Sequence, residues 1–221
     1  MKKLIFLLCC LAANISLFGQ ATPKYSTYYY QRATLFEQLP VSADDILFIG
    51  NSITDGGEWS ELFNNPHVKN RGISGDTTEG VYDRLSVLLK GQPAQIFLLI
   101  GINNVPRGES ANNITEGIRN IVKKVKAESP HTELFVQSLL PVTPHYKMFE
   151  GHTSRWQMIP DINRAIRQMT QEEHVTYIDL FSHFADEQGQ MKTEYTNDGL
   201  HLLGKGYLLW KTIITPYRGL L

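Results

Sequence analysis

Hydrophobic and polar positions along the chain alternate between two kinds of pattern. Short and almost continuous apolar runs predict buried strands, and they lie at Ile46–Ile49, Ile96–Ile100, Leu134–Val136 and Val175–Ile178, with Val68–Asn70 as a weaker fifth. Runs of this kind, bounded by Gly, Pro or polar residues, are typical of parallel strands that are covered on both faces.

Segments with helical periodicity lie between these runs. Their apolar residues fall on one stripe at positions 81, 85, 88 and 89, at 114, 118, 121, 122 and 125, and at 159, 162, 166 and 169, with a less regular segment at 203–214. The first three have start signals, namely Thr77-Thr78, Asn112-Asn113 and Pro160 in the opening turn. Strands and helices in alternation predict an open α/β sheet with helices on both faces.

The first residues do not continue this pattern. A basic start at Met1–Lys3 precedes the apolar run Leu4–Phe18, and the small residues Gly19 and Ala21 follow. This layout predicts a secretory signal peptide over residues 1–20 and a single mature domain over residues 21–221. The run is shorter than the roughly 20 residues of a membrane span. We therefore expect export to the periplasm or the medium, without stable membrane insertion once the signal is removed.

Cysteine usage supports the same interpretation. Cys9 and Cys10 both lie inside the predicted signal, and neither follows the small residue that an acylated lipoprotein cysteine requires, so the pattern favours cleavage over lipidation. The mature chain then has no disulfide, no thiol nucleophile and no Cys-ligated metal.

Charge excludes a further class of function. The chain holds 21 basic and 22 acidic side chains, with no basic face or charged tail, so we expect no nucleic-acid partner. No coiled-coil seam or interface pattern indicates an oligomeric state.

Candidate chemistry is expected directly after the strands, because ligands of open α/β sheets bind beyond the carboxyl ends of the strands. The first strand is followed by Gly50-Asn51-Ser52-Ile53-Thr54, which places Ser52 on a turn before a helix. A helix start also supplies backbone N–H groups. Taken alone, Ser52 is a candidate nucleophile, a helix N-cap, or part of a phosphate-binding turn like that of flavin-binding doubly wound proteins.

Two later loops offer donors for a developing oxyanion. Gly75 lies in the loop 70–78 just ahead of a helix, where its N–H can point into the cleft. Asn103 follows the next strand in Gly101-Ile102-Asn103-Asn104 and carries an amide donor. The alternatives are an ordinary strand-to-helix loop at Gly75 and an Asx turn at Asn103.

Near the C-terminus, Asp198 lies three residues before His201. A turn containing Gly199 can aim the carboxylate at one ring nitrogen and leave the other nitrogen facing a serine. The rival is a metal pair, but no spaced cluster supplies a third and fourth ligand, so we predict no metal site. The remaining histidines have no comparable frame and are interpreted as surface or core residues: His67, His131, His145, His152, His174 and His183.

Together these residues resemble blocks I, II, III and V of the SGNH (GDSL-like) hydrolases in order and spacing. Ser52 matches the block I serine, Gly75 the block II glycine, Asn103 the block III asparagine, and Asp198 with His201 the block V pair. The resemblance implies a three-layer αβα sandwich with a mainly parallel, flavodoxin-like five-stranded sheet. It also implies a serine esterase with a Ser52–His201–Asp198 triad, an oxyanion hole of Ser52, Gly75 and Asn103, and no cofactor.

Two positions depart from the pattern of that family. Asn51 and Asn104 stand where the family usually has aspartate. Each exchange replaces a carboxylate by an amide of nearly the same shape, so positioning by hydrogen bonds can survive while the local charge changes.

The substrate is less clearly indicated. The long loop 141–157 contains Tyr146, Phe149, Arg155 and Trp156, and we consider Tyr146, Arg155 and Trp156, with Asn51 and Asn104, candidates to line the substrate site. Activities of the resembled family range from glycan acetyl esters to phospholipids. An exported enzyme without an acyl-chain tunnel favours O-acetyl groups on carbohydrates, and the partner is then a small-molecule or glycan ester. The alternatives are a lysophospholipase-like acylhydrolase and an inactive glycan-binding relative.

Overall fold

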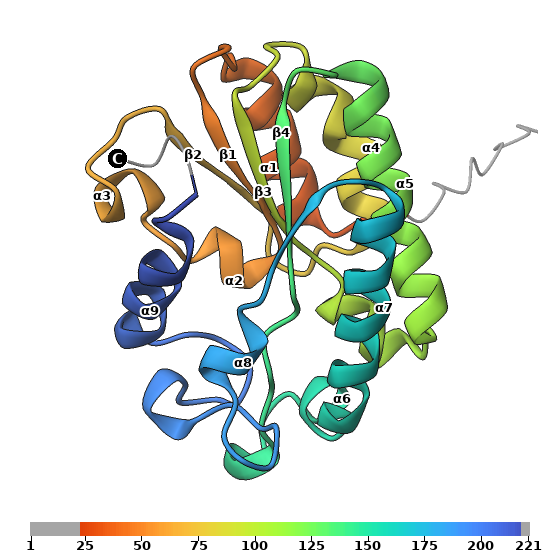
Figure 1. Cartoon of the computed structure of the whole chain (residues 1–221), viewed down its shortest axis with the longest axis vertical. Coiled ribbons are helices and arrows are strands. Elements are labelled where there is room, and N and C mark those ends of the chain that lie inside the picture. The colour runs from red at the N-terminus through yellow and green to blue at the C-terminus, as the bar shows by residue number, and fades with distance from the viewer. Residues whose placement is uncertain (1–22, 218–221) are drawn as a thin grey trace, which may run out of the picture.

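A computed structural model of the chain describes residues 23–217 (Figure 1). The predicted signal peptide lies outside the described residues, and its cleavage stays a prediction. All five apolar runs form strands of one parallel sheet in the order β2-β1-β3-β4-β5. Their bounds are β1 Ile46–Gly50, β2 Val68–Gly72, β3 Gln95–Leu99, β4 Glu133–Gln137 and β5 Thr176–Ile178. The predicted α/β fold with a five-stranded parallel sheet is confirmed.

Helices occupy the four predicted segments, as α4 Thr78–Leu89, α5 Ala111–Glu128, α7 Ile159–Glu172 and α9 Gly204–Ile214. The structure adds α1 Thr27–Gln38 and the short helices α2 Ser52–Asp55, α3 Trp59–Leu62, α6 Glu150–Thr153 and α8 Phe181–Phe184. Short 3₁₀ helices are η1 Ile102–Arg107, η2 Pro144–Tyr146, η3 Trp156–Met158 and η4 Thr193–Tyr195.

Two of the three predicted helix starts are confirmed. Thr77 caps α4 with its hydroxyl, and Pro160 lies in the first turn of α7. The expected start of α5 at Asn112-Asn113 is wrong, because the Ser110 hydroxyl accepts the N–H of Asn113 at 3.1 Å and caps a helix that begins at Ala111. Ser110 therefore supplies the cap that the two asparagines were expected to supply.

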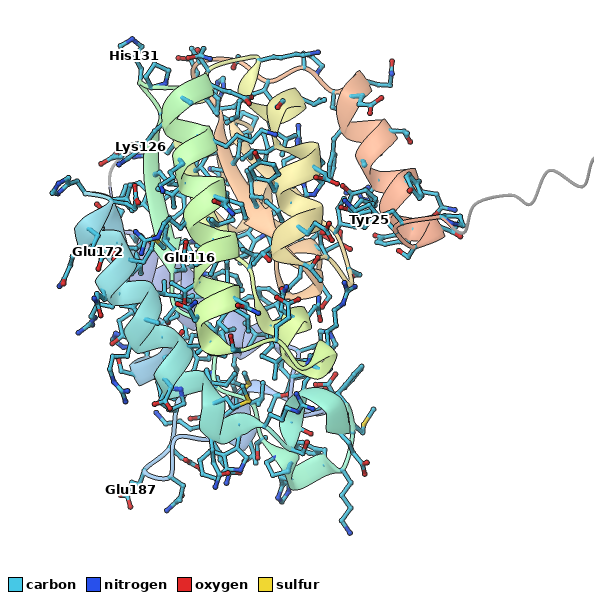
Figure 2. The ribbon with its side chains drawn as sticks, turned by 90° about the vertical axis from the view of Figure 1, so that its right-hand side faces the viewer. Tyr25, Glu116, Lys126, His131, Glu172 and Glu187 are labelled. Atoms are coloured by element: carbon cyan, nitrogen blue, oxygen red, sulfur yellow. The ribbon has the colours of Figure 1, made fainter. Side chains whose placement is uncertain are left out.

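Helices cover both faces of the sheet. One layer consists of α1, α4, α5 and α7, which lie side by side in Figure 2, while α3 and α9 lie on the other side in Figure 1. On the surface of the first layer, Arg119 of α5 reaches Glu172 at 2.7 Å and Glu173 at 3.0 Å at the end of α7. Among residues 23–217, no helix is long and apolar enough to cross a membrane.

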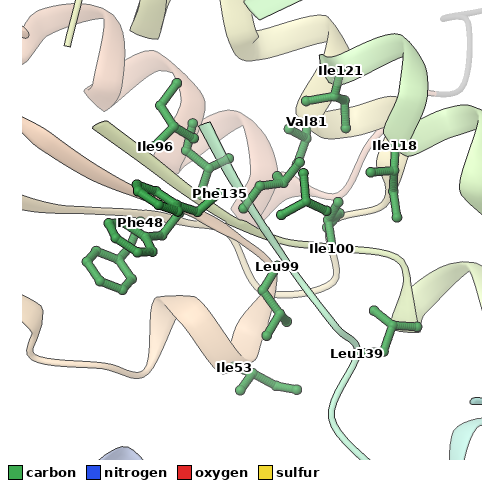
Figure 3. Packing of buried hydrophobic residues seen from close by; sticks show 14 of the residues in the cluster. Phe48, Ile53, Val81, Ile96, Leu99, Ile100, Ile118, Ile121, Phe135 and Leu139 are labelled. Atoms are coloured by element: carbon green, nitrogen blue, oxygen red, sulfur yellow. The ribbon is translucent and has the colours of Figure 1, made fainter. Parts of the chain in front are cut away.

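A row of stacked aromatic rings fills the core on one face of the sheet. Phe48, Phe97 and Phe135 stand in register on β1, β3 and β4, with ring centroids 5.1 and 4.5 Å apart. Figure 3 shows Phe48 and Phe135, the first and last of these rings. Trp59 of α3 continues the row at 4.1 Å from Phe48, and Trp210 of α9 meets Trp59 edge-on at 4.7 Å. Full burial of these rings fixes the sheet and both helices as one rigid platform.

Candidate active site

The turn after β1 frees the hydroxyl of Ser52. Asn51 is the N-cap of α2, because its Oδ1 accepts the N–H of Ile53 at 3.0 Å. Ser52 is thus the first helical residue, and the alternative interpretation of Ser52 as the N-cap is wrong. Its Oγ lies 3.0 Å from Nε2 of His201. The structure therefore brings together two residues that are 149 positions apart in the chain.

The turn between η4 and α9 aims His201 at this serine. Nδ1 of His201 lies 2.7 Å from Oδ2 of Asp198, and a carboxylate can only accept, so Nδ1 carries the proton. The lone pair of Nε2 then faces the Ser52 hydroxyl. Half-buried Asp198 and His201 are 15% and 32% exposed in their side chains, which leaves the imidazole accessible from solvent.

The backbone of this turn is held from two sides. The hydroxyl of buried Thr196 accepts the N–H of Gly199 at 2.9 Å. The carbonyl of Gly199 also accepts the N–H of Thr143 at 2.9 Å. This bond ties the turn to the segment after β4, residues 138–158. Gly199 has φ +89°, and a Cβ there would collide with the Thr143 carbonyl, so only glycine fits.

Donors for an oxyanion lie on the neighbouring loops. Among the described residues, no acceptor takes the backbone N–H of Ser52 or of Gly75. Gly75 has φ +80° and is exposed, with open space where a Cβ would stand. Nδ2 of Asn103 donates to the Asp76 carbonyl at 2.9 Å, which ties the loops after β2 and β3 together. One of the two Nδ2 hydrogens makes this bond, and the other remains for a ligand.

A buried ion pair connects the Gly75 loop to the end of β1. Nε of Arg84 lies 2.8 Å from Oδ2 of Asp76, and both side chains are almost fully buried. Nη2 of the same arginine donates to the carbonyl of Gly50 at 3.2 Å, two residues before Ser52. The Ser52 turn and the Gly75 loop are therefore anchored to one side chain of α4, that of Arg84.

Asn104 is one of the two departures from the family pattern, and its neighbours supply hydrogen-bond partners for both ends of its side-chain amide. It is 2% exposed, and its Nδ2 donates to Oε1 of Glu109 at 2.7 Å and to the Thr78 hydroxyl at 3.1 Å. Its Oδ1 accepts the N–H of Thr78 at 3.2 Å. An aspartate here would face the Glu109 carboxylate, so this chain requires the amide.

The three loop residues considered as substrate-lining make contacts within the protein. The Tyr146 hydroxyl donates to the Thr196 carbonyl at 3.0 Å, Nη1 of Arg155 donates to the Val105 carbonyl at 2.7 Å, and Trp156 packs half-buried against the core. These contacts hold the segment after β4 over the site, and a role in substrate contact stays a prediction for all three residues.

Two other residues of that segment face the site instead. Phe149 presents its ring edge-on to His201 at a centroid distance of 5.0 Å and is 42% exposed. Its backbone has φ +50°, which lies in the left-handed region that residues other than glycine rarely adopt. His152 contacts the Oδ1 of Asn103 through Nε2 at 3.0 Å. The interpretation of His152 as an ordinary surface or core histidine misses this contact, because no periodicity or motif marks the residue.

The metal-pair alternative finds no support in the described part of the chain. Within residues 23–217, no group of three or more His, Cys, Asp or Glu side chains is arranged to hold a metal ion. His201 contacts Asp198 through one ring nitrogen and Ser52 through the other, which is the arrangement of a nucleophile, a base and an orienting carboxylate.

A parallel sheet that carries serine, histidine and aspartate in a hydrogen-bonded series at its carboxyl edge defines a serine hydrolase built on an α/β fold. Residues 48–209 match the model of the GDSL-like lipase/acylhydrolase family, and the chain belongs to that family. The predicted membership and the predicted class of enzyme, a hydrolase acting on ester bonds, are both confirmed.

Other proteins resemble this chain in sequence or in fold. The chain is 29% identical over 170 residues to the platelet-activating factor acetylhydrolase IB subunit alpha2 of Rattus norvegicus, covering 74% of this chain and 71% of the relative. A GDSL-like lipase structure from Bacteroides thetaiotaomicron superposes with a TM-score of 0.73 at 22% identity, covering 85% of this chain and 95% of that one. The acetylxylan esterase Axe2 of Geobacillus stearothermophilus superposes at 0.63 with 18% identity, covering 81% and 95%.

Proposed function

We propose that this protein hydrolyses short-chain esters, above all O-acetyl groups on carbohydrates, through an acyl-enzyme on Ser52. The observation that carries the proposal is the series of contacts from Ser52 Oγ to His201 Nε2 at 3.0 Å and from His201 Nδ1 to Asp198 Oδ2 at 2.7 Å. A serine hydroxyl becomes a nucleophile when an oriented base takes its proton, and this series provides that base.

In the first step, Nε2 of His201 takes the proton of Ser52 while Oγ attacks the ester carbonyl. Asp198 holds the ring in the Nδ1-protonated tautomer and stabilises the imidazolium that forms. The tetrahedral oxyanion is met by the N–H groups of Ser52 and Gly75 and by Nδ2 of Asn103. His201 then gives its proton to the leaving alcohol, and the acyl group remains on Oγ.

In the second step, water replaces the alcohol. His201 takes a proton from this water, the hydroxide attacks the acyl carbonyl, and the same donors stabilise the second oxyanion. Collapse of the intermediate returns the proton to Ser52 and releases the carboxylic acid. The residues of this site perform each proton transfer without a cofactor.

A short acyl group is supported by the relatives. One is named as an acetylhydrolase and another as an acetylxylan esterase, so two of the compared proteins have names that specify an acetyl group although their leaving alcohols differ. The carbohydrate part of the proposal is supported by Phe149, whose exposed ring stands beside His201 where an alcohol would leave. Exposed aromatic faces are suited to stacking on sugar rings. A phospholipid alcohol is the second candidate, favoured by the name of the rat relative.

The test begins with p-nitrophenyl acetate, butyrate and octanoate, hydrolysed by the wild type, Ser52→Ala and Ser60→Ala. Ser60 is an exposed serine on α3 and serves as the matched control. We expect turnover of acetate that falls with chain length, no measurable turnover by Ser52→Ala, and full activity in Ser60→Ala. A fluorophosphonate should label the wild type and Ser60→Ala alone.

The alcohol is identified by acetate release from acetylated xylo-oligosaccharides and from an acetylated ether phospholipid. Faster release from the oligosaccharide supports the carbohydrate proposal, whereas faster release from the phospholipid replaces it with the second candidate. A folded wild type that neither hydrolyses an ester nor reacts with the fluorophosphonate contradicts the mechanism and favours an inactive glycan-binding relative.

A further inference from the structure

His152 lies beside the oxyanion residue Asn103 although the two are 49 positions apart in the chain. It belongs to α6, the short helix in the segment after β4, and α6 packs against η1, which carries Asn103. The imidazole is half-buried, and Nε2 lies 3.0 Å from Oδ1 of Asn103. The proposed mechanism makes no use of this histidine.

The surrounding acceptors determine where the protons lie. The Asp76 carbonyl can only accept, so the nitrogen of the Asn103 amide must face it, at 2.9 Å. The amide oxygen of Asn103 consequently faces His152 and can only accept as well. Nε2 of His152 must therefore carry a proton and donate it to Oδ1. Two fixed partners thus determine both the orientation of the Asn103 amide and the tautomer of His152.

The environment favours a neutral ring with this tautomer. Burial lowers the pKa of His152, and the nearby His201 lowers it further when that base becomes charged during the reaction. Within the described residues, no carboxylate forms an ion pair with His152, and the aromatic neighbour is Phe149 at a ring distance of 6.2 Å. The ring can therefore orient a neighbour without competing with His201 for the proton of Ser52.

We propose that His152 is a positioning residue for the oxyanion hole: its Nε2–H fixes the Asn103 amide so that the second Nδ2 hydrogen faces the substrate oxyanion. The inference rests on the proposed function, since it assigns Asn103 the donor role described there. Without the imidazole, one of the two bonds that orient the amide is lost. A rotated amide would present its oxygen to the developing negative charge and oppose the reaction.

The test is a double-mutant cycle between the two residues. His152→Ala, His152→Gln, Asn103→Ala and the double variant His152→Ala/Asn103→Ala are assayed with p-nitrophenyl acetate. Gln is the conservative choice because its amide nitrogen reaches the place of Nε2 and can donate to Oδ1. His145→Ala is the control on the same segment, since His145 is exposed and its ring contacts the ring of Tyr146 at a centroid distance of 4.8 Å.

We expect kcat of His152→Ala to fall about ten- to hundredfold with little change in KM, below the about 10²–10³-fold loss typical of removing an oxyanion donor. His152→Gln should recover most of the loss, and His145→Ala should match the wild type. In the Asn103→Ala background, His152→Ala should have no further effect, because the group that it positions is gone.

Either of two kinetic results would overturn the inference: independent losses that multiply in the double variant, or a His152→Gln enzyme as slow as His152→Ala. A fall in melting temperature that accompanies the loss of kcat in both single variants would indicate a structural role alone and would also contradict the inference. Retained wild-type activity and a dead Ser52→Ala separate these outcomes from failure of the proposed function. Imidazole ¹⁵N spectra add a readout without turnover: an Nε2-protonated His152 supports the inference, and an Nδ1-protonated ring overturns it.

Discussion

Asp198 holds His201 through both the main chain and the ring. Oδ1 of Asp198 accepts the backbone N–H of His201 at 2.8 Å, while Oδ2 lies 2.7 Å from the ring Nδ1. Oδ1 also accepts the N–H of Leu200 at 2.8 Å. Partial burial acts to raise the pKa of Asp198, but the N–H groups of His201 and Leu200 and the His201 ring outweigh it, so the pKa lies below its usual value. The lowered pKa favours the ionised carboxylate beside Nδ1 of His201.

The ionised oxygen beside Nδ1 is predicted to be essential. Asp198→Asn can keep the backbone contacts through its amide oxygen, but its NH₂ group would face Nδ1 and favour the wrong tautomer of His201. We expect kcat for p-nitrophenyl acetate to fall by about 10⁴, the loss that this exchange causes in a serine protease triad. Asp161→Asn is the control, because exposed Asp161 pairs with Arg164 on the surface of α7. An Asp198→Asn enzyme with a tenth of the wild-type kcat would contradict the role.

Gly75 is predicted to be required for its backbone conformation. A Cβ at Gly75 would meet open space, so Gly75→Ala isolates the effect of φ +80° from any collision. We expect a loss of about 1–2 kcal/mol in the free energy of unfolding, together with a lower kcat, because relaxing φ turns the N–H away. Gly204→Ala is the matched control, since its Cβ also meets open space but its φ lies outside the positive region. Urea unfolding that shows no difference between the two variants would argue against this account.

Asn104 is predicted to depend on Glu109. Asn104→Asp would place a second carboxylate, itself buried, where Nδ2 now donates to Oε1 of half-buried Glu109 at 2.7 Å. We expect a loss of about 1–3 kcal/mol in the free energy of unfolding. Glu109→Gln should recover much of it in the double variant, because the new amide can donate to the carboxylate introduced at position 104. Urea titrations of the single and double variants measure this coupling, and purely additive effects would refute it.

His152 is predicted to make stability depend on pH. Burial lowers its pKa in the folded protein, whereas the unfolded chain has the ordinary value near about 6.5. As pH falls below about 6.5, the unfolded state takes up a proton that the folded state does not, so stability decreases. His152→Gln lacks this titration. From pH 8 to pH 5, the urea midpoint of the wild type should therefore fall more than that of His152→Gln. A difference between the two midpoints that does not change with pH would contradict the prediction.

Local pattern was sufficient to predict most of the framework, for a physical reason. A parallel strand covered on both faces must be apolar throughout, as Phe48 and its neighbours on β1 are, and an amphipathic helix must place its apolar residues on one stripe, as in α5. Helix α1 escaped this argument because its buried residues are Tyr29 and Phe36 only, too few to mark a face. The exact start of α5 depended on which of several polar residues capped it.

Periodicity and position after the strands were enough to predict the strands, the principal helices and the candidates Ser52, Gly75, Asn103, Asp198 and His201, because carboxyl ends of parallel strands meet at one edge of a sheet. Contacts in the folded chain were needed to show that Asn51 caps α2, that Asn104 donates to Glu109, and that Phe149 and His152 face the site. Those contacts depend on how the segment after β4 packs over the sheet edge. Packing of an irregular segment against distant loops leaves no periodic trace in the chain, so no local pattern could reveal it.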